Sequence, residues 1–194
     1  MSLFELYFRL GLSHIADLKG YDHILFILTL CAVYSLSAWK KVLILVTAFT
    51  IGHSLTLALA TLELIRIDTG LIEFLIPLTI FLTALANILV PGQKVSPLLH
   101  SLKYAAALFF GLIHGLGFSN YLRSLLGSEK GLVFPLFSFN LGIEAGQILI
   151  VASIMLLTMV VVELLHYSRR EWHVLLSGAG LGVSLVLMIE RFPF

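Results

Sequence analysis

The sequence predicts an all-α, polytopic membrane protein: a bundle of about six transmembrane helices with an amphipathic helix at its N-terminus. Hydrophobic residues make up 59% of the 194 residues, whereas soluble domains contain roughly 45–50%. Charged residues make up only 12%, about half of the roughly 25% found in soluble domains. The apolar runs are long and continuous, which favours helices over the alternating strands of a membrane barrel.

The first 18 residues predict a short amphipathic helix that lies along the membrane interface. Apolar side chains between Leu3 and Leu12 fall near one helical face, with Glu5 and Arg9 off that face. Six apolar runs follow, and each can supply the roughly 20 residues that a span needs. We expect spans at 21–38, 41–62, 70–90, 102–119, 134–165 and 173–190. No linker interrupts them, so residues 1–194 are interpreted as a single membrane domain.

The distribution of Lys and Arg gives only a weak orientation. The loops after the first, third and fifth spans carry six basic residues, and the opposite side also carries six. Most loop acids lie on the second side, so we expect the first side to be cytoplasmic and both termini to be extracytoplasmic. The net charge of +1 gives no reason to expect nucleic acid as a partner. The expected partners are the lipid bilayer and a metal ion, and the sequence is compatible with a homo-oligomer.

Ionisable residues inside the runs occur near one depth. They lie early in odd-numbered runs and in the later half of even-numbered runs, and consecutive spans alternate in direction. All of them are therefore expected in one leaflet: Asp22, His23, His53, Glu73, His114 and Glu144. Three imidazoles and three carboxylates at one depth predict a metal site, because ionisable groups inside a membrane are costly and commonly functional.

The first candidate ligands lie at the start of the first span. Asp22 and His23 offer two ligand types, or a ligand and its orienting acceptor; alternatively Asp22 caps the helix and His23 sits at the interface. His14, on the amphipathic helix, is either interfacial or delivered to the same site by a fold-back of that helix. Glu73 is a ligand, a gate or an interfacial acid.

His53 lies in a polar stripe of the second span, beside Ser54 and Thr50. Small hydroxyl residues commonly join membrane helices, so the histidine carries the functional signal. The fourth and fifth spans each contain a GxxxG motif, one around His114 and one around Glu144, with Asn140 one turn before Glu144. The alternative to a metal site is a single buried hydrogen bond from His114 to Glu144 that joins these two spans.

Imidazole and carboxylate together suit Zn, Ni, Cu, Fe or Co, and disfavour Mg and Ca, which prefer oxygen ligands alone. Cys31 lies away from the predicted site, so Cu(I) is disfavoured. The other histidines fall on the opposite side and are excluded from the site: His100, His166 and His173.

These motifs resemble the HupE/UreJ family of small bacterial membrane proteins. The matching segments are 14–15, 20–26, 49–57, Glu73, 110–118 and 139–147. The resemblance implies a nickel or cobalt permease of the bacterial inner membrane. It also implies that the cation is handled by five residues: Asp22, His23, His53, His114 and Glu144. Seven residues separate His14 from Asp22, where the best-studied nickel-permease branch has five, so the chain is more similar to the second, less characterised branch.

Two functions follow from these observations. The first is a permease for a divalent transition metal ion (Ni, Co or Zn). The alternative is an intramembrane, metal-dependent hydrolase or transferase that uses Zn and acts on a lipid or lipoprotein. In that enzyme Asp22 or Glu144 would be the general base, and Asn140 or Ser54 would donate to an oxyanion. A metal sensor or assembly subunit is a third reading. A cavity that continues past His53 toward Asn87 would favour transport, and a closed floor would favour catalysis.

Overall fold

The computed structural model describes residues 2–90, 97–126 and 131–193, which contain helices and no strand. The predicted all-α class is therefore confirmed for the described residues. The α-helices are α1 Leu3–Ile15, α2 Asp22–Cys31, α3 Trp39–Thr61, α4 Thr69–Leu89, α5 Pro97–Leu126, α6 Val133–Met159 and α7 Arg169–Glu190. The short elements are the 3₁₀ turn η1 Leu36–Ala38 and the π-helical turn η2 Val160–Leu164, which prolongs α6.

Five helices in the described ranges are long and apolar enough to cross a membrane: α3, α4, α5, α6 with η2, and α7. They occupy the last five predicted spans. Capping residues set two of the boundaries, because Asp68 accepts a hydrogen bond from the Leu71 amide and Ser168 accepts one from the Glu171 amide. The chain is a multi-pass membrane protein.

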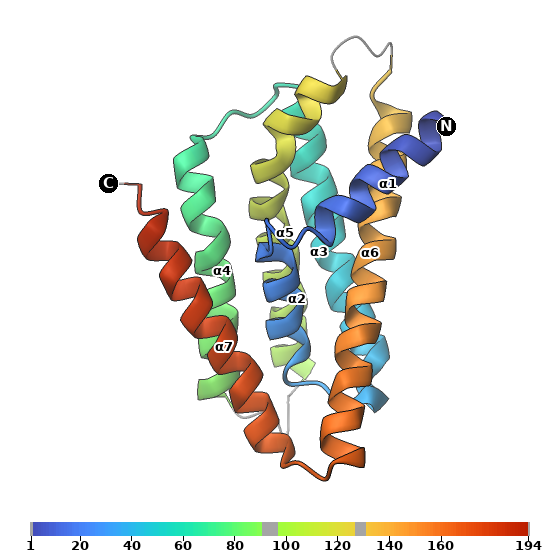
Figure 1. Ribbon diagram of the computed structural model, residues 1–194. Coiled ribbons are helices and arrows are strands. Elements are labelled where there is room, and N and C mark those ends of the chain that lie inside the picture. The colour runs from blue at the N-terminus through green and yellow to red at the C-terminus, as the bar shows by residue number, and fades with distance from the viewer. Residues whose placement is uncertain (1, 91–96, 127–130, 194) are drawn as a thin grey trace.

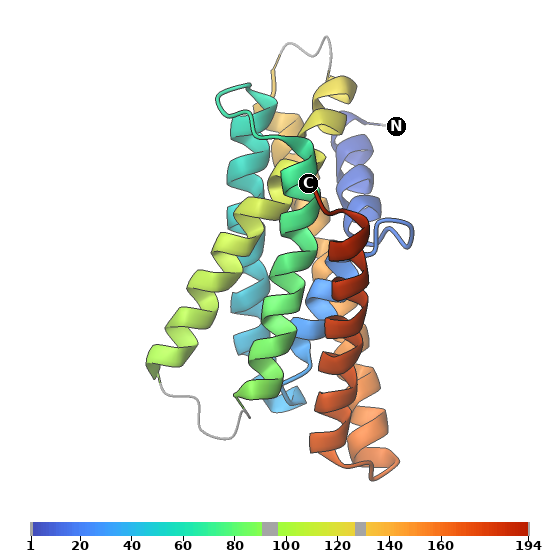
Figure 2. The same ribbon diagram turned by 90° about the vertical axis from the view of Figure 1, so that its left-hand side faces the viewer.

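The first predicted span differs from its prediction. The helix there, α2, has only 10 residues, which rise about 15 Å, half of the roughly 30 Å hydrocarbon core. It ends in a turn in which the Tyr34 amide donates to the Cys31 carbonyl, and η1 follows. Most of α2 is buried, and Figures 1 and 2 show it among the other helices. Its apolar side chains therefore pack inside the bundle and do not form a full membrane span.

Helix α1 lies where the amphipathic helix was predicted, and it packs against α6. Ser2 caps its first turn by accepting a hydrogen bond from the Glu5 amide. A Cβ atom added at Gly11 would overlap the Phe139 carbonyl oxygen, and one added at Gly142 would overlap the Phe8 carbonyl oxygen. The two backbones are therefore in direct contact, and α1 is held on the bundle by an interface that only glycine permits.

The bundle is built from three helix pairs: α3 with α5, α1 with α6, and α4 with α7. The α3–α5 pair repeats the glycine arrangement, since a Cβ atom at Gly52 would overlap the Leu108 carbonyl oxygen and one at Gly111 that of Phe49. Figure 1 shows both termini at the same end of the bundle. We call this the terminal end; it also carries the α3–α4 connection.

Candidate metal centre

Four histidines from four helices meet in the half of the bundle toward the terminal end. His14 lies in the last turn of α1, His23 in the first turn of α2, His53 in the second half of α3 and His114 in α5. The glycine contacts explain how they meet. Gly11 seats α1 on α6 three residues before His14, and Gly111 holds α5 against the α3 backbone at His53.

Three of these histidines are spaced to share an ion. One ring nitrogen from each of His14, His23 and His53 lies within 4.8 Å of the others. The ring centroids of His14 and His23 are 4.7 Å apart, and those of His23 and His53 are 5.8 Å apart. Because a Zn–N bond is about 2 Å long, small side-chain rotations would bring the three nitrogens into one coordination sphere.

Ring nitrogens of these three histidines lack protein partners. Nε2 of His14, Nε2 of His23 and both ring nitrogens of His53 are buried without a hydrogen-bond partner among the described residues. The side chain of His53 is 0% exposed. Buried polar groups are normally hydrogen-bonded, because an unmet one costs free energy. Unmet imidazole nitrogens on three histidines this close together therefore fit a bound cation.

His114 borders this trio from α5, although it is not among the three histidines whose ring nitrogens lie within 4.8 Å of one another. Its ring centroid lies 5.2 Å from that of His23. Its Nε2 is 3.0 Å from Thr79 Oγ1, and this hydroxyl also donates to the Ile76 carbonyl at 2.7 Å. A hydroxyl has a single hydrogen to donate, so Thr79 accepts from Nε2–H of His114. Nδ1, which has no described partner, is then the unprotonated nitrogen available to a metal.

Asp22 reaches the edge of the cluster but is shared with the last helix. Arg191 Nη1 donates to Asp22 Oδ2 at 3.1 Å, and the other carboxylate oxygen is buried without a described partner. The sequence prediction missed Arg191. Its position just after the last predicted span is consistent with the depth of Asp22.

A cavity of about 410 Å³ connects the cluster to the terminal end. Glu73 is exposed and lies on its wall. The wall carries three carboxylates, those of Asp17, Asp22 and Glu73, and one guanidinium, that of Arg191. A negative wall concentrates cations. The cavity is lined by His14, Asp17, Gly20, Asp22, His23, Glu73, Ile76, His114, Gly117, Phe118 and Arg191.

The cavity ends at the histidine rings. Phe49 packs against His114 with ring centroids 5.0 Å apart, and Phe26 packs against Phe49 at 4.8 Å. Both phenylalanines are buried, and neither they nor His53 line the cavity. Among the described residues, the site therefore has a cavity on the side toward the terminal end and packed aromatic rings on the side away from it.

Glu144 is not brought into the histidine cluster. Its Oε1 accepts a hydrogen bond of 2.7 Å from Thr47, and one turn along the seam between α3 and α6 Thr50 donates to Gln147. No hydrogen bond joins His114 to Glu144 in the described part of the chain. The alternative prediction, a His114–Glu144 hydrogen bond between α5 and α6, therefore does not describe this structure. Glu144 Oε2 is buried without a described partner.

The two predicted oxyanion donors also lie away from the cavity wall. Ser54 is half-buried on α3, and Asn140 is half-buried on α6 with an unmet Oδ1. Neither lines the cavity that holds the histidines. Of the two predicted general bases, only Asp22 does.

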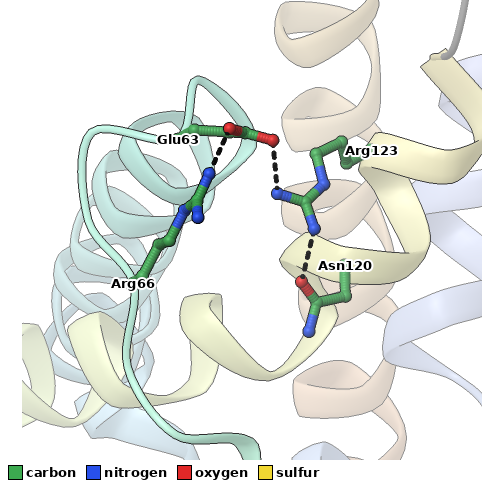
Figure 3. A network of polar contacts seen from close by, with 4 residues as sticks. All are labelled: Glu63, Arg66, Asn120 and Arg123. Atoms are coloured by element: carbon green, nitrogen blue, oxygen red, sulfur yellow. Dashed lines mark hydrogen bonds and ion pairs between the residues drawn. The ribbon is translucent and has the colours of Figure 1, made fainter.

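A second polar network clamps the α3–α4 connection to α5 (Figure 3). Glu63 accepts from Arg66 and from Arg123, the latter at 2.8 Å, and Arg123 also donates to Asn120 at 3.2 Å. Glu63 has a φ of 61°, a left-handed conformation that is uncommon outside glycine. All four residues lie outside the predicted spans, and the clamp could not be predicted because Glu63 and Arg123 are 60 residues apart in the chain.

A family model described as "HupE / UreJ protein" matches residues 1–191. The match covers nearly the whole chain, including every residue of the histidine cluster. No curated protein and no solved structure matches the chain.

Proposed function

The chain belongs to the HupE/UreJ family, and from this premise we propose that it is a permease for a divalent transition metal ion, Ni, Co or Zn. The family is generally one of nickel and cobalt transporters. We propose His14, His23, His53 and His114 as the ligands that first hold the ion. Asp22 and Glu73 would draw it into the cavity.

The observation that carries this proposal is the convergence of unmet imidazole nitrogens inside a membrane bundle. Histidine-rich sites select transition metals over Mg and Ca. A buried cluster of this kind serves little structural purpose, because hydrogen-bonded or apolar side chains would stabilise the bundle better. The negatively lined cavity supports an entry route from the terminal end.

The closed floor fits one state of a permease that works by alternating access. A cation that leaves the histidines inward needs a second polar stretch, and the α3–α6 seam offers one. Thr50 and Thr47 lie one and two turns from His53 along α3, and the second of them is hydrogen-bonded to Glu144. We propose Glu144 as the next cation-binding group on the inward route.

The test combines metal binding with metal uptake. Purified protein is titrated with Ni²⁺, Co²⁺ and Zn²⁺, and the same protein in proteoliposomes is assayed for uptake of each ion. We expect His53→Ala to abolish both. His100→Ala is the matched control, since His100 lies at the opposite end of the bundle beside Lys41, and it should bind and transport as wild type does.

A metal-dependent hydrolase is the second candidate, and the closed aromatic floor is the observation that favours it. Asp22 would serve as the general base on the cavity wall, and the substrate would be a lipid or lipoprotein. Wild-type protein that binds metal through His53 but transports none of the three ions would overturn the permease and favour this enzyme. Protein that binds none of them would overturn both proposals.

We further propose that the protein resides in the bacterial inner membrane with both termini extracytoplasmic. The placement of N and C at one end of the bundle supports a shared side (Figure 1). Reporter fusions or cysteine labelling at each terminus would test the side.

A further inference from the structure

A second cavity lies toward the opposite end of the bundle, between α2, α3, α4 and α5. Its volume is about 150 Å³, which is smaller than the roughly 300–1,000 Å³ of pockets that enclose a whole drug-sized ligand. None of the histidines line it. Leu30, Leu45, Leu82 and Phe110 are among its apolar walls. It is therefore separate from the candidate metal centre.

The cavity has a basic group and no acid in its lining. Lys103 on α5 lies at its wall, with its ammonium nitrogen 5.5 Å from the centre of the Tyr34 ring. No ion pair joins Lys103 to a carboxylate within residues 2–90, 97–126 and 131–193. One turn earlier on α5, His100 lies 2.9 Å from the Lys41 ammonium. This end of the α3–α5 pair thus presents basic groups beside an apolar chamber.

This chemistry selects one kind of occupant. A metal cation would be repelled by the ammonium groups, and a wholly apolar molecule would leave Lys103 without a counter-charge in a low-dielectric setting. We propose that the cavity binds an anionic amphiphile, with an acyl chain among the apolar walls and a phosphate or carboxylate head at Lys103. Basic pockets between membrane helices commonly hold anionic lipid headgroups.

The inference is independent of the proposed function, because the two cavities share no lining residue. Two sources could supply the same chemistry: an anionic phospholipid of the bilayer or a free fatty acid. The experiment therefore uses the delipidated full chain and three probes, namely phosphatidylglycerol, phosphatidylcholine and oleate. Binding is measured by native mass spectrometry and by the lipid-dependent shift of the thermal unfolding midpoint.

We expect phosphatidylglycerol or oleate to bind in preference to phosphatidylcholine. Lys103→Met should weaken binding of the anionic probe about fivefold, since one basic group near a lipid surface contributes about 1 kcal/mol. Lys103→Arg should retain binding. Lys19→Met is the matched control, because Lys19 is an exposed lysine in the α1–α2 connection.

A second pair of variants tests the chamber itself. Ala86 lines the cavity, whereas Ala105 is exposed on α5 and does not line it. Ala86→Phe should abolish binding of the anionic probe, and Ala105→Phe, which adds the same volume elsewhere, should leave it unchanged. Equal binding of phosphatidylglycerol, oleate and phosphatidylcholine would overturn the proposal. So would an unchanged affinity in either Lys103→Met or Ala86→Phe, and if one variant does not fold, the other decides.

Discussion

At the scale of single residues, metal binding at the proposed centre would depend on the tautomer of each imidazole. His114 shows how one neighbour fixes a tautomer. With its one hydroxyl hydrogen on the Ile76 carbonyl, Thr79 accepts from His114 Nε2. Nδ1 is left with its lone pair free. The partner of a ligand histidine thus decides which nitrogen meets the ion.

Thr79→Val should therefore weaken metal binding without removing a ligand. Valine keeps the shape of threonine but leaves Nε2 of His114 without an acceptor, and loss of such a partner typically lowers metal affinity by about 10- to 100-fold. Isothermal titration with Ni²⁺ or Co²⁺ measures the change. Thr83→Val is the control, because the Thr83 hydroxyl donates to the Thr79 carbonyl and does not reach His114. Equal affinities in the two variants would argue against His114 as a ligand.

At the scale of helices, glycine determines which elements approach closely. Gly52 and Gly111 let the α3 and α5 backbones touch, while Gly11 and Gly142 do the same for α1 and α6. Both pairs deliver histidines to the centre. The positions of these histidines therefore depend on how tightly the two helix pairs pack.

Gly52→Ala should destabilise the protein. The new methyl group would overlap the Leu108 carbonyl oxygen, and forcing extra volume into a packed interface costs about 1–3 kcal/mol. Gly178→Ala on α7 is the matched control, because nothing lies within 4 Å of a Cβ atom there. Alanine is favoured over glycine inside a helix by roughly 0.5–1 kcal/mol. The two thermal unfolding midpoints should shift in opposite directions, and a shift in the same direction would show that the α3–α5 contact is looser than described.

The α3–α4 connection should loosen in acid. Hydrogen bonding to Arg66, and the charges of Arg66 and Arg123, hold the pKa of the Glu63 carboxyl below its ordinary value. The clamp is therefore at full strength when the pH lies above the ordinary pKa of a glutamate. It weakens as the pH falls through the lowered pKa of Glu63. Hydrogen exchange of residues 62–68, corrected for intrinsic rates, should show this dependence. Glu63→Gln should exchange fast at neutral pH with little pH dependence; retention of the wild-type profile would mean that another contact holds the loop.

The sequence predicted the helices and the depth of the ionisable residues in the membrane, but not which residues of different helices contact one another. Alternating span direction placed the ionisable residues in one half, and the GxxxG motifs indicated close packing. It could not tell that Gly142 faces α1, or that Arg191 meets Asp22, since such contacts depend on the three-dimensional arrangement. The prediction that residues 21–38 form a full span was wrong because an apolar run has the same sequence pattern whether it faces lipid or is buried by protein. Glu144 shares the predicted depth but lies in a different seam.

At the scale of the whole molecule, the two ends of the bundle differ in chemistry. The terminal end holds carboxylates above imidazoles, the groups that we propose attract and bind the cation. The opposite end holds Lys41 and Lys103 beside an apolar chamber, which disfavours cations. A metal ion that crosses this molecule should therefore avoid the second cavity and follow the α3–α6 seam, where Glu144 provides negative charge.

Glu144→Gln separates binding from passage. The proposed histidine ligands are untouched, so affinity for Ni²⁺ or Co²⁺ should stay within about twofold. Passage should slow by at least about tenfold, because an ion in the seam would lose its counter-charge, and 1.4 kcal/mol already accounts for a factor of ten. Paired titration and proteoliposome uptake measure the two quantities, with the exposed Glu163→Gln as control. A matching loss of affinity would instead make Glu144 a ligand of the histidine centre, and unchanged uptake would place the inward route elsewhere in the bundle.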